Sequence, residues 1–501
     1  MANTFAVSRS HLIYGVCLPL AVLVGYLLAS PLESSSIAVV VLVLSVLSIP
    51  ILMRWHHPLL IISWNAVISP AFLPGNPYLW SIMAGLSLFF SLLNRSLGHN
   101  LNFFRASSVS KSLIFFGIVV LATASLTGGI GVRALGAASF GGKKYFYIFA
   151  AIAGYFALAS QNIPRNRAGL YVSLFFLAGL TSLVNYLAIY GGRIFSFIPS
   201  FFPVDVDAGM AAAGPNLMGM EVFRMMGFAP AAIGIICFLL ARYGVQGLFE
   251  LRKPWRSGLF FLGITASLYA GFRSNMALFA GAFFILFYLE GLFRTRYFLI
   301  IMLVGALTGA ALLPNLHKLP LSVQRSLSFL PINVDPLARE SAEGSTVWRV
   351  EMWKDLIPQV PRYLIKGKGY SLSPDELFMV MESSMRGYAR SSDEFELAGD
   401  YHNGPLSLII PFGIGGVIGF CWFLIAAVKV LHQNYRFGDS SLRQINTFLF
   451  AYFVVRICFF LFVFGSTFSD LFIFTGLVGL SVSLNGGVCR PSNQLSEAVS
   501  E

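Results

Sequence analysis

Long apolar stretches alternate with short polar ones along most of the chain. Stretches of about 17–25 apolar residues have the length that crosses the hydrocarbon core of a bilayer. They predict fourteen membrane-spanning helices, at residues 12–30, 36–53, 57–73, 78–94, 111–127, 144–160, 168–190, 225–242, 257–272, 275–292, 297–313, 404–429, 445–465 and 468–485. Composition agrees, because 56% of the residues are hydrophobic, only 11% are charged and the mean hydropathy is +0.75. These values exclude a soluble globular domain and indicate an all-α polytopic membrane protein.

The longest polar segment interrupts this pattern between residues 314 and 401. The chain therefore has four predicted parts. They are residues 1–313 with the first eleven predicted spans, the polar segment 314–401, residues 402–487 with the last three spans, and a Ser-rich acidic tail at 488–501. The polar segment predicts a small helical unit. One helix is expected over Thr346–Ile357, and another begins at Pro374 after the N-cap Ser373. The tail is expected to be disordered.

Positive charge along the short loops predicts the orientation of the chain. If the N-terminus is cytoplasmic, seventeen Lys and Arg residues fall on inner loops and six on outer ones. This imbalance satisfies the positive-inside rule, so both termini are predicted to be cytoplasmic and residues 314–401 to lie outside. The six outer cations are Arg133, Lys143, Lys144, Arg193, Arg224 and Arg273.

Nothing in the composition points to a cofactor. The five cysteines form no CxxC pair, so neither a disulfide framework nor a metal knuckle is predicted. The acids before residue 402 are irregularly spaced and favour no metal site, namely Asp393, Glu394, Glu396 and Asp400. The net charge of +12 is scattered over loops without an aromatic platform, so nucleic acid is not an expected partner.

The stretch from Gly399 to Gly419, GDYHNGPLSLIIPFGIGGVIG, leads from the polar segment into an apolar helix. Pro405 suits a first helical position, which places His402 just before the helix N-terminus. The positive end of the helix dipole disfavours imidazolium, so His402 is a candidate general base. The alternative is a histidine that only caps the helix. Four other histidines fall on predicted inner loops and receive no catalytic role: His56, His57, His99 and His432.

Two arginines occupy outer helix boundaries, where the charge rule works against cations. Arg224 opens one span in GMEVFRMMGFAPA, and Arg273 lies in the turn AGFRSNMALF between two spans. Two planar guanidinium groups suit a diphosphate better than two ammonium groups would. Alternatively, each arginine contacts lipid head groups or pairs with a nearby acid such as Glu221.

Further cations are weaker candidates for substrate binding. Lys143, Lys144 and Arg193 extend the predicted outer positive surface, although contact with head groups is the simpler interpretation. Arg456 lies near the middle of the thirteenth predicted span, where an arginine is costly unless it faces protein or water. It is expected either to form a structural ion pair with Asp470 or to contact substrate.

Taken together, these motifs resemble the O-antigen ligase and polymerase superfamily. The resemblance covers about residues 210–430 and rests on the order of its motifs. They are Arg224 followed by Gly227, the FRSNMAL turn at Arg273, an outer loop with Arg349, Trp353, Gly367 and Gly369, and His402-Asn403 leading into a GIGG helix. Two departures are the AGF before Arg273, where Ser or Thr is common in the family, and the fourteen predicted spans, where about twelve are usual.

The resemblance implies a GT-C-type helical membrane fold in the bacterial inner membrane and a periplasmic active site. It implies transfer of a glycan from undecaprenyl diphosphate, without nucleotide or metal, to the lipid A core (ligases), a second lipid-linked repeat unit (polymerases) or a protein hydroxyl (oligosaccharyltransferases). Proteins of polysaccharide export or chain-length control are further implied partners. Arg224, Arg273 and His402 match the family's catalytic positions, and Arg349 and Asn403 are then expected to bind substrate.

Two other classes of function remain open at this point. A transporter or lipid-glycan flippase suits the number of spans, but carriers concentrate charge in a central cavity and have related halves. Here the central charge is Arg456, and no duplication is evident. A structural subunit of an envelope assembly is the third interpretation, and it predicts that substitution of His402 is tolerated.

Overall fold

The computed structural model describes residues 18–19, 21–22, 25, 34–97, 102–128, 142–213, 222–371, 374–386, 396 and 399–491. Most of the predicted first span, Arg133, Glu221, Asp393, Glu394 and the tail from residue 492 lie outside these ranges. Within them, every regular element is helical.

The helices follow the apolar pattern of the chain. Those of the N-terminal part are α2 (Ser34–Ser63), α3 (Leu79–Ser96), α4 (Ser107–Thr127), α6 (Gly142–Ser160), α7 (Ala168–Leu177), α8 (Asn185–Tyr190), α9 (Val206–Ala213), α10 (Phe228–Leu248), α11 (Pro254–Tyr269), α12 (Arg273–Leu289) and α13 (Arg296–Leu312). They continue with α14 (Leu321–Leu327), α15 (Pro336–Leu356), α16 (Val360–Tyr363), α17 (Pro374–Met385), α19 (Gly404–Phe437), α20 (Arg443–Phe462) and α21 (Thr467–Asn485). A helix covers each predicted span from 78–94 onward, with an interruption in 168–190.

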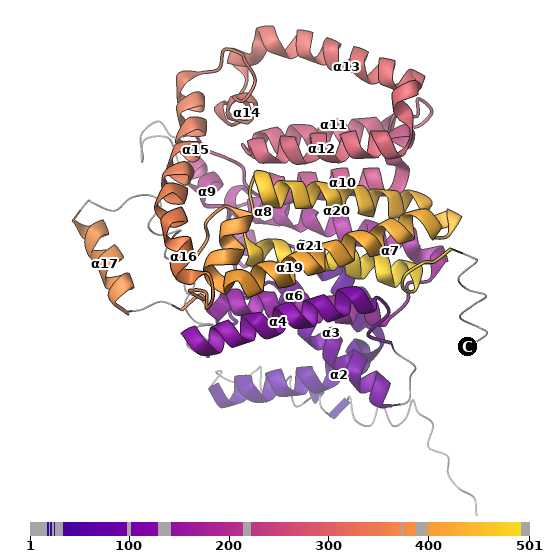
Figure 1. Ribbon diagram of the computed structural model, residues 1–501, viewed down its shortest axis with the longest axis vertical. Helices are drawn as coiled ribbons and strands as arrows, with labels where there is room; N and C mark the ends of the chain where they lie inside the picture. Colours follow the sequence, from indigo (N-terminus) through magenta and orange to yellow (C-terminus); the bar gives the residue numbers. More distant parts are fainter. Residues whose placement is uncertain are drawn as a thin grey trace, which may run out of the picture.

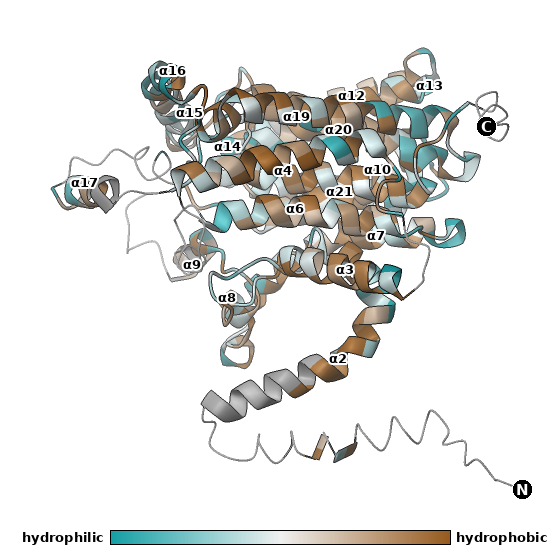
Figure 2. Cartoon of the chain, turned by 60° about the horizontal axis from the view of Figure 1, so that its bottom comes forward, coloured by the Kyte–Doolittle hydropathy of each residue, from teal (hydrophilic) through white to brown (hydrophobic). Residues whose placement is uncertain are grey.

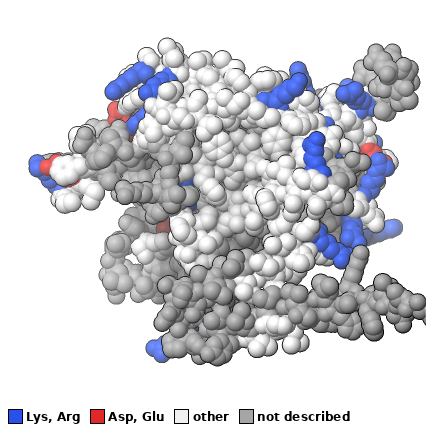
Figure 3. Space-filling view, turned by 90° about the horizontal axis from the view of Figure 1, so that it is seen from below, with Lys and Arg blue, Asp and Glu red and all other residues white. Residues whose placement is uncertain are grey.

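Seven helical segments in the described residues are long and apolar enough to cross a membrane. They are Val46–Ser63, Ser107–Thr127, Arg165–Tyr190, Phe228–Leu248, Gly404–Phe437, Ser440–Phe462 and Thr467–Asn485. Two shorter apolar helices accompany them, Arg273–Leu289 and Arg296–Ala311. Polar residues gather near the helix ends (Figure 2), and Lys and Arg lie toward two sides of the face in Figure 3, with a broad uncharged band between them. The chain is therefore a polytopic α-helical membrane protein.

The bundle is built from helices that lie side by side across the view in Figure 1. At its centre, α21 packs against α6 and α19, and α20 packs against α19, α10 and α12. The described part of residues 314–401, which we call the outer segment after its predicted location, lies over one end of the bundle. There α15 crosses the ends of the bundle helices, and α14 and α16 lie next to α15 (Figure 1). We call this end the α15 end.

One prediction about the spans is wrong. Residues 36–53 and 57–73 were expected to form two spans, but α2 is one helix that ends at Ser63, and residues 64–78 are not helical. His56 and His57, expected on the loop between these spans, are buried inside α2. Their ring nitrogens bond to neighbouring helices, His56 Nδ1 to Ser87 Oγ at 2.8 Å and His57 Nε2 to the Leu158 carbonyl at 3.0 Å. These contacts let a polar pair lie within an apolar helix.

The outer segment is fixed to a kink in α19. Gly413 has φ 60° and ψ −161°, which interrupts the helix after Pro411. The turn that contains Gly367 and Gly369 fills the gap: Lys368 N–H donates to Ile410 at 2.7 Å and Gly369 N–H to Pro411 at 3.0 Å. A Cβ on Gly367 would lie 2.2 Å from the Pro411 carbonyl oxygen, so only glycine permits this approach. The kink therefore holds the outer segment against the helix that follows His402.

Candidate active site

The backbone at His402 has an uncommon conformation. Its φ is 50°, in the left-handed region, and the next residue, Asn403, is the N-cap of α19. The side-chain oxygen of Asn403 accepts a hydrogen bond from Leu406 N–H at 3.0 Å. Pro405 is the second residue of α19, one position later than the sequence predicts. Asn403 rather than His402 therefore caps the helix, which excludes the interpretation of His402 as a simple cap and gives Asn403 a structural role. Such strained conformations cluster at functional sites.

Aromatic side chains from two distant elements enclose the imidazole. Phe464, in the link between α20 and α21, lies 4.9 Å from the His402 ring, and Trp348 of α15 lies 5.3 Å away, both measured between ring centroids. Trp353, one turn further along α15, donates its indole N–H to the Tyr401 carbonyl at 2.8 Å. The side chain of His402 is only 12% exposed. The ring is therefore held between α15 and the membrane bundle.

The surroundings of His402 favour its neutral form. Burial lowers the pKa of His402 below its ordinary value of 6.5, and the positive charges of Arg349 and Lys144 lower it further. Asp400 acts in the opposite direction, with its carboxylate 4.0 Å from His402 Nδ1. The sequence argument invoked only the helix dipole. The structure adds burial and two cations, which act in the same direction.

Arg224 lies just before α10 and packs on the turn between α11 and α12. Its Nε donates to Asp207 of α9 at 3.1 Å, and Glu221, the acid expected from the sequence, lies outside the described residues. A Cβ on Gly271, in that turn, would lie 2.8 Å from Arg224 Cγ. The AGF sequence before Arg273, a departure from the resembled family, thus supplies a glycine that gives Arg224 room.

Arg273 is the first residue of α12, and its guanidinium reaches α15. Nη2 donates to the Ala342 carbonyl at 2.6 Å and lies 3.1 Å from Thr346 Oγ1. Arg224 and Arg273, 49 positions apart in the sequence, therefore flank the same turn at the α15 end of the bundle.

Arg325 is a further member of the site that the sequence analysis did not select. It lies in α14, is 6% exposed, and donates to Gly271 O, to Ser341 Oγ at 3.0 Å and to Ser345 Oγ at 2.7 Å. Burial, and then the charges of Arg224, Arg273 and Arg349, lower the pKa of Arg325 to about 10, while Asp207 opposes this shift. A lone arginine between serines in the short helix LSVQRSL was the available signal.

Arg349 completes a cluster of four arginines, with Arg224, Arg273 and Arg325, that we call the cationic cluster. Burial and the charges of Arg273 and Arg224 lower the pKa of Arg349, and Asp400 raises it. The Arg349 guanidinium lies 5.7 Å from the ring of Phe464, which also packs against His402. Its Nε is buried and has no hydrogen-bond partner among the described residues. Arg349 thus connects the cationic cluster to His402.

The two predicted lysines differ. Lys144 is buried, its ammonium lies 4.4 Å from the ring centroid of Phe468, and its charge acts on His402. Lys143 lies instead over Tyr147, at 5.8 Å. Lys144 therefore belongs to the surroundings of His402, and no described contact brings Lys143 there.

Arg193 and Arg456 lie apart from the cationic cluster. Arg193 is exposed in a short turn, and no hydrogen bond or ion pair of its side chain to another described residue is present. Arg456 is 7% exposed and donates to Asp470 at 2.5 Å, the partner expected from the sequence. Arg456 also lines an internal cavity.

No protein-family model matches the chain, and no curated protein matches it at a significant level. Any statement about activity therefore rests on the residues and their arrangement.

The site has an excess of positive charge beside His402. Arg224, Arg273, Arg325, Arg349 and Lys144 supply five positive charges, against three from Asp207, Glu343 and Asp400, the acids whose charges act on these cations. Among the described residues, no group of three or more His, Cys, Asp or Glu side chains could hold a metal. Guanidinium groups bind phosphate oxygens through paired N–H donors. The arrangement can thus hold an anion close to a neutral imidazole.

Proposed function

We propose that the chain is a membrane glycosyltransferase that moves a glycan from undecaprenyl diphosphate to an acceptor hydroxyl. The cationic cluster binds the diphosphate, and His402 is the general base. The observation that carries the proposal is the meeting of Arg224, Arg273 and Arg325 around one turn, with Arg349 near enough for its charge to act on Arg325, next to a buried histidine whose pKa is lowered. The resemblance to O-antigen ligases and polymerases supports the same assignment.

The anion expected in this site is strongly charged. Arg325 is buried with three other arginines acting on it, an arrangement that costs free energy while no counter-charge is present. Asp207 and Asp400 offset only part of it. A diphosphate supplies two or more negative charges and several acceptor oxygens. Four guanidinium groups, each with paired N–H donors, therefore match a diphosphate better than a single carboxylate.

In the proposed reaction, the acceptor oxygen attacks the anomeric carbon from the face opposite the diphosphate. The bond between the anomeric carbon and the diphosphate oxygen breaks, and its electron pair leaves with the diphosphate. His402 takes the proton of the acceptor hydroxyl, and the anomeric configuration inverts. The cationic cluster stabilises the charge that develops on the leaving group. The donor is already activated, so the reaction needs no other energy source.

Placement of His402 fits this role. Phe464 and Trp348 cover the ring, and exclusion of water strengthens each electrostatic interaction in the site. Arg349 is the member of the cationic cluster that shares the ring of Phe464 with the imidazole, so a diphosphate bound there and the sugar attached to it would lie beside His402.

The proposal includes the location. The α15 end faces the periplasm, and the opposite end, with both termini, faces the cytoplasm of a bacterium with the chain in its inner membrane. The excess of Lys and Arg on the predicted inner loops supports this orientation. A cysteine placed at the exposed Val347 of α15 should react with a membrane-impermeant maleimide in intact spheroplasts; protection until the membrane is opened would reverse the assignment.

Glycan transfer by purified protein tests the function. Lipid-linked glycan extracted from cells that lack the protein serves as donor, and membranes from the same cells supply the acceptor. Product formation in detergent, where there is no second compartment, supports a transferase. Movement of donor across proteoliposomes without transfer would support the flippase interpretation instead.

Accumulated material in a deletion strain identifies the acceptor class. Lipid A core together with free undecaprenyl-linked polymer indicates a ligase. Single lipid-linked repeat units indicate a polymerase. A protein that lacks its glycan indicates an oligosaccharyltransferase.

A further inference from the structure

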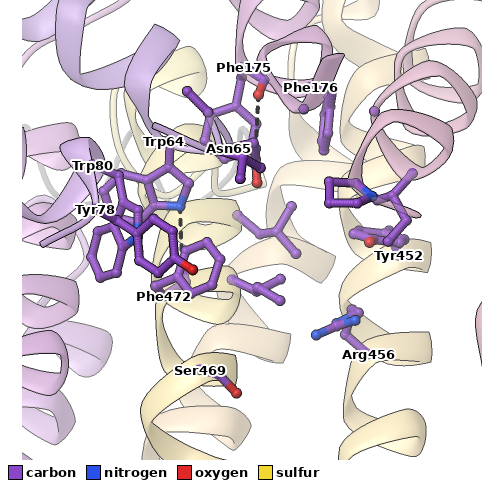
Figure 4. A pocket seen from close by; sticks show the side chains of 18 of the residues that line it. Trp64, Asn65, Tyr78, Trp80, Phe175, Phe176, Tyr452, Arg456, Ser469 and Phe472 are labelled. Atoms are coloured by element: carbon purple, nitrogen blue, oxygen red, sulfur yellow. Dashed lines mark hydrogen bonds between the residues drawn. The ribbon is translucent and has the colours of Figure 1, made fainter. Parts of the chain in front are cut away.

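A cavity of about 400 Å³ lies inside the bundle, and none of the four clustered arginines lines it. Most of its wall is apolar, and much of it is aromatic (Figure 4). Trp64 and Trp80 lie with their ring centroids 5.6 Å apart, and Trp80 stacks on Phe472 at 4.9 Å. Phe175 stacks on Trp64 at 6.4 Å, and Phe176 and Tyr452 line other parts of the wall (Figure 4). The cavity is large enough for a ligand, since an apolar cavity of about 150 Å³ already binds benzene.

Two interrupted helices form part of this wall. The chain leaves α2 at Trp64, whose indole meets Gly154 and Gly476, both well inside α6 and α21. The extended segment that follows bonds to the 3-10 stretch η2 (Ala178–Val184), with Val67 N–H donating to Thr181 Oγ1 at 2.8 Å. Non-helical backbone at membrane depth is tolerated where it is buried in protein or lines a cavity. Interrupted helices of this kind often surround ligand sites.

One end of the cavity carries polar groups. Arg456 points into it from α20, and Ser469 of α21 lies nearby (Figure 4). Arg456 is 7% exposed and gives one N–H to Asp470, but its buried Nε has no hydrogen-bond partner among the described residues. A buried donor without an acceptor costs about 1–3 kcal/mol. The exposed part of the same guanidinium is the group that a ligand oxygen at this end of the cavity would meet.

The apolar wall and the polar end at Arg456 together indicate the chemistry of the ligand. A sugar would bury several hydroxyls against aromatic rings that offer them few partners, and each unpaired hydroxyl is costly. A hydrocarbon chain matches the wall along most of its length. We propose that the cavity binds one hydrocarbon chain of a membrane lipid, isoprenoid or acyl, with an oxygen at its polar end accepting from the guanidinium of Arg456, which lines that end. This site does not depend on the proposed transferase activity.

The cavity lies directly inward from the cationic cluster. Arg224 precedes α10 by a few residues, and Pro230 and Gly234 of the same helix line the cavity. Pro230 and Gly234 lie two and six residues after the start of α10 at Phe228, which corresponds to about 3–9 Å of helix. Phe468, which Lys144 contacts, also lines the cavity. A lipid with its phosphates at the cluster could therefore place its chain here, and so could a bulk phospholipid.

Photolabelling distinguishes these two sources. The full chain in nanodiscs is irradiated with either of two diazirine probes, one on a long-chain isoprenyl diphosphate and one on the acyl chain of phosphatidylethanolamine. Labelled residues are then mapped by mass spectrometry. Label on cavity residues such as Trp64, Phe472 or Tyr452 from either probe supports the site, and the probe that labels identifies the source of the chain. Label confined to lipid-facing residues with both probes overturns the proposal.

A matched pair of variants sharpens the test. Ile233→Trp fills the cavity from α10, whereas Ile418→Trp adds the same bulk to a position of α19 that is 54% exposed. We expect at least a fivefold loss of cavity labelling in Ile233→Trp and none in Ile418→Trp. Equal labelling in both overturns the site. If Ile233→Trp does not fold, as judged by its thermal unfolding, Ala66→Leu, also in the wall, takes its place with the same expectation.

Discussion

Arg325 donates a hydrogen bond to the carbonyl oxygen of Gly271, in the turn between α11 and α12. Since Arg325 also bonds to Ser341 and Ser345 of α15, one buried guanidinium fixes that turn to the outer segment. Arg224 packs on this turn and Arg273 follows it. Arg325 therefore sets the spacing between the arginines of the membrane bundle and Arg349 of α15.

Substitution of Arg325 should weaken donor binding. Arg325→Lys keeps the charge but loses the forked donors, and loss of charged hydrogen bonds costs about 1.5–3 kcal/mol, roughly a tenfold or larger rise in KM for the donor. The measurement is steady-state transfer at varied donor concentration. Arg339→Lys is the control, because Arg339 is exposed on α15, the helix to which Arg325 bonds, and donates only to Ile332 O within the described residues. Similar KM values in both variants would contradict this role.

Gly271→Ala should impair activity through Arg224. The residue has φ +74°, and the new Cβ would lie 2.8 Å from Arg224 Cγ, so Arg224 must move. Gly291→Ala is a matched control: its φ is +70°, but its Cβ would meet nothing within 4 Å. Both variants carry a backbone strain of about 1–2 kcal/mol. We expect similar losses of thermal stability and a loss of transfer at least tenfold greater in Gly271→Ala. Equal transfer activity in Gly271→Ala and Gly291→Ala would show that transfer does not depend on the position of Arg224 against this turn.

The pH dependence of transfer should report His402. A general base acts when neutral, and the pKa of His402 is lowered below 6.5. The rate should therefore be constant above this pH and fall as the pH drops through the lowered pKa. Asp400→Asn removes the charge that raises this pKa and should move the acidic limb to lower pH. Lys144→Met removes a charge that lowers it and should move the limb to higher pH.

The acidic limb must move in opposite directions in Asp400→Asn and Lys144→Met. Rate profiles of kcat/KM between pH 4.5 and 8 for the three proteins provide the measurement. Shifts in the same direction, or an acidic limb that neither substitution moves, would assign the titrating group elsewhere.

The ion pair between Arg456 and Asp470 should be strongly coupled. Both side chains are buried, and removal of one partner from such a pair costs about 3–5 kcal/mol because the other charge remains unpaired. Arg456→Met alone should lower the thermal unfolding temperature markedly, and Arg456→Met with Asp470→Leu should restore most of it. Additive losses in the double variant would show that the pair is not the source of the effect.

The sequence predicts the apolar helices well because each has to satisfy its own backbone within the bilayer, so local composition decides it. It does not predict where α2 ends. Trp64 leaves the helix because its indole fits between Gly154 and Gly476 and bonds to Phe472 O, contacts that are remote in the sequence. The hydropathy pattern also predicts His56 and His57 on a loop, because it carries no information about contacts with other helices. In the structure both side chains are buried in α2, and they bond to Ser87 and to the Leu158 carbonyl.

The candidate site was predictable where a motif carried it. Arg224, Arg273, Arg349 and His402 came from loop charge and from the resemblance, and the structure brings their charges within reach of one another. Arg325 was missed because the charge rule exempts long outer segments, so the charge of a single arginine there does not mark it, and the serines around it were the available signal. Phe464 was missed because a phenylalanine in this chain is unremarkable until its position against His402 is known.

The most direct test of the central claim separates binding from chemistry at His402. Purified wild-type protein and His402→Gln in nanodiscs are compared for binding of undecaprenyl diphosphate and for transfer from lipid-linked glycan extracted from cells that lack the protein. We predict equal binding and a loss of transfer of about 10²–10⁴-fold in His402→Gln, the usual contribution of a general base. Transfer within a few-fold of the wild-type rate by a folded His402→Gln variant would contradict the account.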